Sequence, residues 1–210
     1  FDSMYREPRV RFVGARHEQG AGCMAFGYAR STGRPGMYTV VPGPGVLNST
    51  AALCSAYATN APVLCLTGQI PSQAIGRGIG YLHELPDQLA TLRLLTRWAD
   101  RIDRPQDAPA LVNQAFAHLW GGRRGPLSLE MPMDIMALQS EVDLLDAAQP
   151  LPPPVLDTDR VEQAAQLLAS SQRPLIIVGG GAVDAHEAVF ELAQRLQAPV
   201  VSFRSGRGIV

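Results

Sequence analysis

The chain has 210 residues, 46% of them hydrophobic, which is more apolar material than one small domain needs. Its 18 basic and 19 acidic side chains leave a formal net charge of -1, and no basic run occurs, which argues against a nucleic-acid or anionic-membrane partner. No apolar run reaches the ~18 residues that span a bilayer, and the first residues lack a signal-peptide pattern, so we expect a cytoplasmic protein.

Short apolar runs in the first part of the chain have the length and composition of β-strands. They are residues 10–15 (VRFVGA), 36–41 (GMYTVV), 62–68 (PVLCLTG), 97–102 (RWADRI) and 125–132 (GPLSLEMP). The third run is apolar almost throughout, as expected of a strand covered on both faces. Because helical patterns alternate with these runs, we predict an α/β fold with a parallel sheet flanked by helices.

Between the strands, apolar residues recur at the three- and four-residue spacing of amphipathic helices. The predicted buried faces are Ala21, Met24, Ala25 and Tyr28; Leu47, Ala51, Cys54 and Ala58; and Val112, Ala115, Phe116 and Leu119. The cysteines show no CxxC or Cys/His metal spacing, so we expect buried free thiols in a reducing compartment at Cys23, Cys54 and Cys65.

The composition changes at residues 139–157, which have little periodicity and include the proline triplet 152–154. Consecutive prolines favour an extended, semi-rigid conformation, which is typical of a linker between domains. We therefore predict one domain over residues 1–138, a Pro-rich linker over 139–157 and the first part of a second α/β domain over 158–210.

The second domain is predicted to contain strands at residues 174–182 (PLIIVGGGA) and 198–203 (APVVSF). Two helices are expected, each beginning with a capping-box pair and each burying one apolar face. The pairs are Asp159 with Glu162 and Asp184 with Glu187; the faces are Val161, Ala164, Ala165 and Leu168, and Val189, Leu192, Ala193 and Leu196.

Two glycine-rich turns follow strands and are candidate ligand sites. In GGGAVD, a dinucleotide fingerprint would need a third small residue where Asp184 stands, so the pattern favours a tight strand-to-helix turn. In PGPGVLN, Gly43 and Gly45 flank Pro44 and let a flat ligand ring approach the backbone, while Asn48 follows in the first helical turn. Any tight turn of this kind could use such glycines, so this motif alone is weak.

Other chemistries find little support in the sequence. There is no G-x-S-x-G pattern of a serine hydrolase. The adjacent pairs His17–Glu18 and His83–Glu84 project in different directions, which is poor geometry for metal ligands, and we predict no metal-binding residues.

Glu18 has two interpretations. An acid in the first turn of a helix is favoured by the helix dipole. However, the next charged residue is Arg30, and a helix this small and apolar is expected to be packed on all sides. Glu18 would then be buried, with a raised pKa that suits proton transfer near neutral pH.

Taken together and in this order, several motifs resemble the thiamine diphosphate (ThDP)-dependent enzymes of the acetolactate synthase and pyruvate oxidase type. The motifs are RHEQGAGCMAFGYARSTGRPG, PGPGVLNST, APVLCLTGQIP, GPLSLEMPMD, RPLIIVGGGA and LQAPVVSF, and they cover nearly the whole chain. The resemblance implies a pyrimidine-binding domain that lacks its opening segment, followed by part of a Rossmann-like central domain.

In the family, the glutamate that matches Glu18 hydrogen-bonds N1′ of the cofactor's aminopyrimidine and promotes formation of the ylide that attacks a 2-oxo acid. The residues that match Pro44 and Asn48 lie around the pyrimidine ring, so the resemblance implies cofactor contacts at residues 43–45 and Asn48. The central domain binds FAD in some members, so FAD is possible here, and Mg²⁺ is held by a further domain. Pyrimidine domains pair across subunits, which implies a homodimer or homotetramer.

The loop over residues 68–90 departs from acetolactate synthases. Their matching loop carries Phe-Gln-Glu where this chain has Leu82-His83-Glu84, so His83 is either a proton donor near the reaction centre or a simple loop residue. The chain starts without Met and stops within a pattern, so we expect part of a longer polypeptide that is inactive alone. The alternatives are an acetolactate synthase-like carboligase, another 2-oxo acid decarboxylase, and a non-catalytic binding or assembly module.

Overall fold

The computed structural model describes residues 2–210, and the chain divides into two compact units, residues 1–154 and 155–210. The first unit contains six α-helices among its described residues: α1 (Asp2–Arg6), α2 (Glu18–Thr32), α3 (Pro44–Ala58), α4 (Gln88–Leu95), α5 (Ala108–Trp120) and α6 (Met133–Met136). Its strands are β1 (Gly36–Val40), β2 (Val63–Gln69), β3 (Trp98–Arg101) and β4 (Leu127–Pro132).

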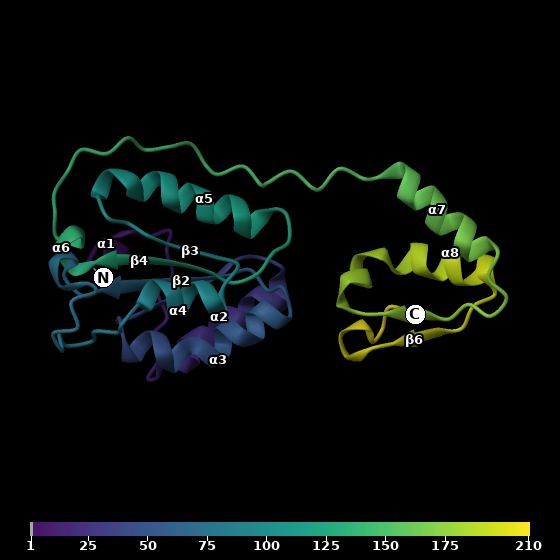
Figure 1. Ribbon diagram of the computed structural model, residues 1–210, viewed down its shortest axis with the longest axis horizontal. Helices are drawn as coiled ribbons and strands as arrows, with labels where there is room; N and C mark the ends of the chain where they lie inside the picture. The colour runs from purple at the N-terminus through teal and green to yellow at the C-terminus, as the bar shows by residue number, and fades with distance from the viewer. Residues whose placement is uncertain (1) are drawn as a thin grey trace. The chain divides into compact units, whose positions relative to one another are not determined.

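The four strands form one parallel sheet in the order β1-β2-β4-β3, with β2 and β4 in the interior. Helix α5 covers one face of the sheet, and α2, α3 and α4 lie on the other face (Figure 1). Between consecutive strands, a crossover that contains α3, α4 or α5 returns the chain to the same end of the sheet, as parallel pairing requires. The predicted α/β class, with parallel strands flanked by helices, is confirmed.

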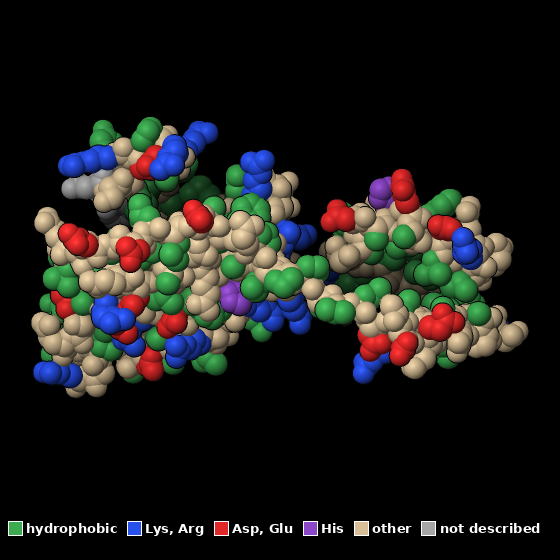
Figure 2. Space-filling model, turned by 90° about the horizontal axis from the view of Figure 1, so that it is seen from above, with side chains coloured by type: hydrophobic (Ala, Val, Ile, Leu, Met, Phe, Trp, Pro, Cys, Tyr) green, Lys and Arg blue, Asp and Glu red, His purple; other side chains and the backbone are tan. Residues whose placement is uncertain are grey.

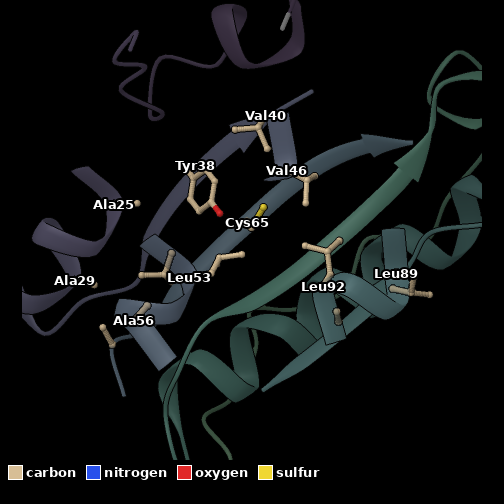
Figure 3. Packing of buried hydrophobic residues seen from close by; sticks show 13 residues of the cluster. Ala25, Ala29, Tyr38, Val40, Val46, Leu53, Ala56, Cys65, Leu89 and Leu92 are labelled. Carbon is tan, nitrogen blue, oxygen red and sulfur yellow. The ribbon is translucent and has the colours of Figure 1, made fainter. Parts of the chain in front are cut away.

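Two clusters of buried side chains hold these layers together. On the α2–α3–α4 side, Leu53, Cys65 and Leu92 are completely buried, and Figure 3 shows them facing one another between the helices and the sheet. On the α5 side, Leu64 and Leu119 belong to the second cluster. Because successive side chains of a strand point to opposite faces, the neighbouring residues of β2 serve both clusters.

The predicted strand over residues 10–15 is wrong, because the structure assigns no strand to this segment. Its apolar side chains are about half exposed, with fractions of 49% for Val10, 55% for Phe12 and 58% for Val13. Alternating apolar residues predict a strand only when a neighbouring strand completes the backbone hydrogen bonds and covers one face. In the described part of the chain, β1 is the strand at that edge of the sheet.

The helices form near their predicted positions, but the buried faces differ. In α3, Val46, Ala52, Leu53 and Ala56 are buried, whereas the predicted face of Leu47, Ala51, Cys54 and Ala58 is exposed. In α2, Ala25 is buried as expected, but Met24 and Tyr28 are about half exposed. Of the three cysteines, Cys65 is buried, while Cys23 and Cys54 lie on the exposed helix faces, contrary to the prediction.

The second unit contains α7 (Thr158–Ala169), β5 (Ile176–Val178), α8 (His186–Leu196) and β6 (Val200–Ser202), and β5 pairs with β6 in parallel. The predicted caps are not observed. Asp157, not Asp159, caps α7 by accepting a hydrogen bond from the Arg160 backbone N–H, and a 3₁₀ segment over Gly180–Ala185 precedes α8. The 3₁₀ turn therefore moves the start of α8 past Asp184.

The outer surface carries charges of both signs. On the face shown in Figure 2, acidic and basic side chains are interspersed with hydrophobic ones, and no large area of one sign is visible. Among residues 2–210, no helix is long and apolar enough to cross a bilayer.

Candidate functional site

A tight turn follows β1 at the carboxyl end of the parallel sheet, which is where α/β sheets commonly bind ligands. Gly43 has the left-handed backbone angle φ +61°, and a Cβ atom there would lie 2.4 Å from the carbonyl oxygen of His83. A Cβ on Gly45 would lie 2.7 Å from Cγ2 of Val41, and Pro44 is the first residue of α3. The turn thus needs glycine at both positions, and both glycines are buried, with the His83 carbonyl against Gly43.

Glu18 and Asn48, from two neighbouring helices, meet close to this turn. The Nδ2 of Asn48 donates a hydrogen bond to Oε2 of Glu18 over 3.2 Å. His17 is the N-cap of α2, and its Nδ1 accepts from the Gln19 backbone N–H. Because His17 caps the helix, the carboxylate of Glu18 stays available to a ligand.

The prediction that Glu18 is buried with a raised pKa is wrong for this chain. Its side chain is only partly buried, and its own backbone N–H and the amide of Asn48 lower the pKa of its carboxyl. Donors at the start of a helix stabilise the anion, and they outweigh the partial burial of the carboxylate, which acts in the opposite direction. Glu18 is therefore an accessible, ionised hydrogen-bond acceptor.

The loop between β2 and α4 brings His83 to the turn through its backbone. His83 has φ +72°, and its carbonyl packs against Gly43. Glu84 closes the loop, since its carboxylate accepts hydrogen bonds from the backbone N–H groups of Gly78 (2.9 Å) and Tyr81 (2.8 Å), which lowers its pKa. Six residues were singled out from the sequence: Glu18, Gly43, Pro44, Gly45, Asn48 and His83. The structure brings Glu18 into contact with Asn48, and Gly43 into contact with His83.

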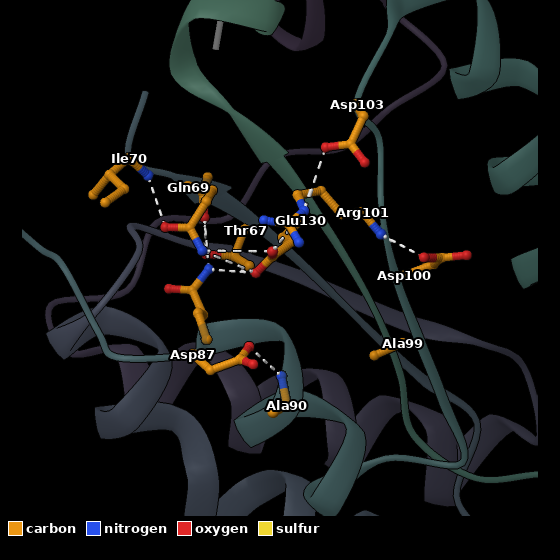
Figure 4. Close-up of polar contacts among 12 residues, drawn as sticks. Thr67, Gln69, Ile70, Asp87, Ala90, Ala99, Asp100, Arg101, Asp103 and Glu130 are labelled. Carbon is orange, nitrogen blue, oxygen red and sulfur yellow. Dashed lines mark hydrogen bonds and ion pairs between the residues drawn. The ribbon is translucent and has the colours of Figure 1, made fainter. Parts of the chain in front are cut away.

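A buried polar group lies behind the turn, and sequence reasoning missed it. Glu130 on β4 is completely buried, and its carboxyl is reached by Gln88 at 2.8 Å, by Gln69 at 3.4 Å and by the Arg101 guanidinium at 3.5 Å. Figure 4 shows Gln69 and Arg101 converging on Glu130. The glutamate in the apolar run LSLEMP could have indicated this group, because a charged side chain in an interior strand must have polar partners.

Burial raises the pKa of the Glu130 carboxyl, and the hydrogen bond from Gln88 and the charge of Arg101 only partly offset this. Arg101 faces Glu130 in the pairing of β3 with β4. The pKa values of the two glutamates near the turn are therefore shifted in opposite directions: that of Glu18 is lowered and that of Glu130 is raised.

The glycine turn of the second unit is closed by a contact within that unit. The Gly180 backbone N–H donates to Oγ of Ser205 over 3.0 Å, and a Cβ on Gly206 would lie 2.3 Å from the carbonyl oxygen of Val178. Across residues 2–210, no cluster of three or more His, Cys, Asp or Glu side chains has a metal-binding arrangement.

Two family models match this chain. Residues 1–91 match the N-terminal TPP-binding domain of thiamine pyrophosphate enzymes, and residues 161–210 match the central domain of the same enzymes. Thiamine pyrophosphate is another name for ThDP. The chain belongs to the thiamine pyrophosphate enzyme family. The turn at Gly43 and the residues Glu18 and Asn48 lie within the part that matches the TPP-binding domain.

Three full-length relatives show the same relationship. A protein of Pseudomonas aeruginosa named as a probable 2-ketoarginine decarboxylase is 38% identical over 96% of this chain and 36% of the relative's length. Acetolactate synthase of Arthrospira platensis is 34% identical over 99% of this chain and 37% of its own length. The large subunit of acetolactate synthase isozyme 1 of Escherichia coli is 30% identical over 95% of this chain and 35% of its own length. The chain thus spans about a third of the length of these thiamine enzymes.

Proposed function

We propose that the protein containing this chain is a ThDP-dependent enzyme that decarboxylates or ligates a 2-oxo acid, with Glu18 as the residue that activates the cofactor. The observation that carries the proposal is the Glu18–Asn48 contact beside the tight glycine turn, inside a segment that matches a TPP-binding domain. The names of the relatives, a 2-ketoarginine decarboxylase and acetolactate synthases, support a 2-oxo acid as the substrate class.

The residues present fit the aminopyrimidine of ThDP. An accessible carboxylate that accepts a hydrogen bond, an exposed amide side chain and an exposed proline on a rigid turn suit a flat heteroaromatic ring with an acceptor nitrogen and an amino group. When bound, ThDP supplies a carbanion equivalent that attacks the carbonyl carbon of the substrate. Glu18 holds and returns the proton at the pyrimidine nitrogen, and Asn48 fixes the carboxylate in place.

The low pKa of Glu18 refines this role. An ionised carboxylate in contact with water is a weak proton relay, because the proton can pass to solvent. We propose that the binding of the cofactor covers Glu18 and raises its pKa towards the working pH, as desolvation does for acids. His83, which lies over the turn, is the second proposed catalytic residue, in the role of a proton donor to the substrate.

A homodimer or homotetramer is part of the same proposal. Helices α2 and α3 pack against each other, and outward-facing side chains of Met24, Tyr28 and Leu47 remain 45–48% exposed. Apolar side chains gathered on adjacent helices favour association with another copy. Size-exclusion chromatography of the full-length protein should show a dimer or tetramer, and a monomer at micromolar concentration would contradict this.

The proposed activity is tested in the full-length protein by measuring CO2 release from a panel of 2-oxo acids with ThDP and Mg²⁺. We expect Glu18→Gln to lower kcat/KM about a hundredfold or more, because proton transfer by a positioned side chain contributes roughly 10²–10⁴-fold. Omission of Mg²⁺ tests the proposed metal, and visible flavin absorbance of the purified protein tests FAD.

Glu187 provides a matched control. It is also the acid in the first turn of a helix, and its side chain is exposed at the start of α8. Glu187 belongs to the second unit, so Glu187→Gln changes the same functional group outside the candidate site of the first unit and should retain the wild-type rate. Equal rates for the Glu18 and Glu187 variants would overturn the role of Glu18.

A further inference from the structure

The side-chain amide of Gln88, the first residue of α4, makes a hydrogen bond with each of three separate elements. Its Oε1 accepts from the Gly43 backbone N–H over 2.8 Å. Its Nε2 donates to the Gly68 carbonyl over 3.0 Å and to Oε2 of Glu130 over 2.8 Å. The side chain is 1% exposed, and it connects the turn after β1 with the ends of β2 and β4.

The orientation of this amide is set by its surroundings. One partner is a donor and the other two are acceptors, so only the observed placement of oxygen and nitrogen satisfies all of them. Glu130 is also fixed, because Gln69 and Arg101 contact its carboxyl from β2 and β3. Gln88 therefore ties Gly43 to an anchor in the middle of the sheet.

We propose that Gln88 is a positioning residue that sets the place of the Gly43 turn from the buried Glu130. Its effect reaches the candidate site because Gly43 is the N-cap of α3, and Asn48 of α3 bonds Glu18. The Gly43 N–H also needs this partner, since a buried backbone N–H that has no acceptor is destabilising. The consequence for ThDP rests on the function proposed above, whereas the coupling between Gln88 and the turn does not.

The coupling is tested first without cofactor, by hydrogen exchange of a peptide covering residues 41–47 in the full-length protein. Pro42 and Pro44 have no backbone N–H, so Gly43 contributes a large share of the hydrogen exchange measured for this peptide. We expect Gln88→Met, which keeps the size and removes all three hydrogen bonds, to speed exchange at Gly43 at least tenfold. Unchanged exchange in a folded Gln88→Met protein would overturn the proposal.

Thr96 gives the matched control, because it is a buried polar residue at the other end of α4. Its Oγ1 donates to the Leu92 carbonyl over 2.7 Å and makes no contact with the turn. Thr96→Val should lower the melting temperature while leaving exchange at residues 41–47 unchanged. Equal acceleration in both variants would mean that Gln88 only stabilises the fold, and this would contradict positioning.

If Gln88→Met does not fold, exchanging the side chains of Gln88 and Glu130 provides a second test. Gln88→Glu keeps the acceptor for Gly43 but places a carboxylate against Glu130, so exchange at the turn should accelerate. Adding Glu130→Gln restores a donor–acceptor pair with the same total charge as the wild type, so exchange should become slower again, but not as slow as in the wild type because the Gly68 carbonyl still lacks its donor. Failure of the second change to slow exchange would contradict the proposal.

The effect on the cofactor is measured by titrating the full-length protein with ThDP in the presence of Mg²⁺ and following intrinsic fluorescence. We expect Gln88→Met to weaken ThDP binding about tenfold and to lower kcat at saturating ThDP much less, while Thr96→Val binds normally. Normal ThDP affinity in the Gln88 variant would contradict the inference. If the wild-type protein bound no ThDP, the proposed function would fail, and hydrogen exchange would still decide the role of Gln88.

Discussion

Glu18 and Glu130 are two glutamates linked to the same turn, and their surroundings differ in almost every respect. Glu18 stands at the start of α2, is partly exposed and has a lowered pKa from backbone and amide donors. Glu130 lies in an interior strand, is completely buried and has a raised pKa from desolvation. An accessible carboxylate suits contact with a ligand, whereas a buried one with a full set of partners suits the placement of other groups.

The largest difference is expected in stability. Glu130→Leu removes the acceptor for the Nε2 groups of Gln88 and Gln69 and leaves Arg101 without its buried partner. Buried donors without a partner are costly, so we expect a loss of about 2–3 kcal/mol in the free energy of unfolding. Glu18→Leu, at a more exposed position, should change stability little. Urea unfolding of both variants checks this, and equal losses would contradict the contrast.

A smaller effect is expected in the pH dependence of stability. Because the pKa of Glu130 is raised in the folded state, the folded protein holds this proton more tightly than the unfolded chain does. The contribution of Glu130 is therefore most favourable at acidic pH and is lost as pH rises through the folded pKa, by at most about 1.4 kcal/mol per pH unit.

Glu130→Gln removes this titration and keeps the shape of the side chain. Its stability relative to wild type should therefore increase as the pH is raised from mildly acidic to neutral. Unfolding free energies of the two proteins across this range give the measurement. A difference that stays constant or falls with rising pH would show that the partners of Glu130 outweigh its burial.

The sequence predicted the order of elements well because the strands differ from the helices in hydrophobic period and length. It predicted the faces of α2 and α3 poorly. Small residues such as Ala51, Ala52 and Cys54 occupy both sides of α3, so the period identifies a helix without showing which side is buried. For the same reason, Glu18 was predicted to be buried. The small apolar residues that follow it show that the helix packs against something, but not that this packing covers the acid.

The Glu130 cluster depends on contacts that are remote in sequence. The pairing of β4 with β2 and β3 brings Gln69 and Arg101 to Glu130, and the packing of α4 against the sheet brings Gln88. The turn at Gly43 was predictable, because two glycines around a proline between a strand and a helix have few structural alternatives. Its hydrogen bond to Gln88 was not, since 45 residues separate the partners.

The central claim is that Glu18 activates ThDP, and its most direct test is the exchange of the cofactor's C2 proton with deuterium. The rate is measured by quenched-flow and proton NMR on the full-length protein, without any substrate. We expect Glu18→Gln to slow this exchange about a hundredfold or more, while Glu187→Gln exchanges at the wild-type rate. A wild-type exchange rate in the Glu18→Gln protein with ThDP bound would contradict the account.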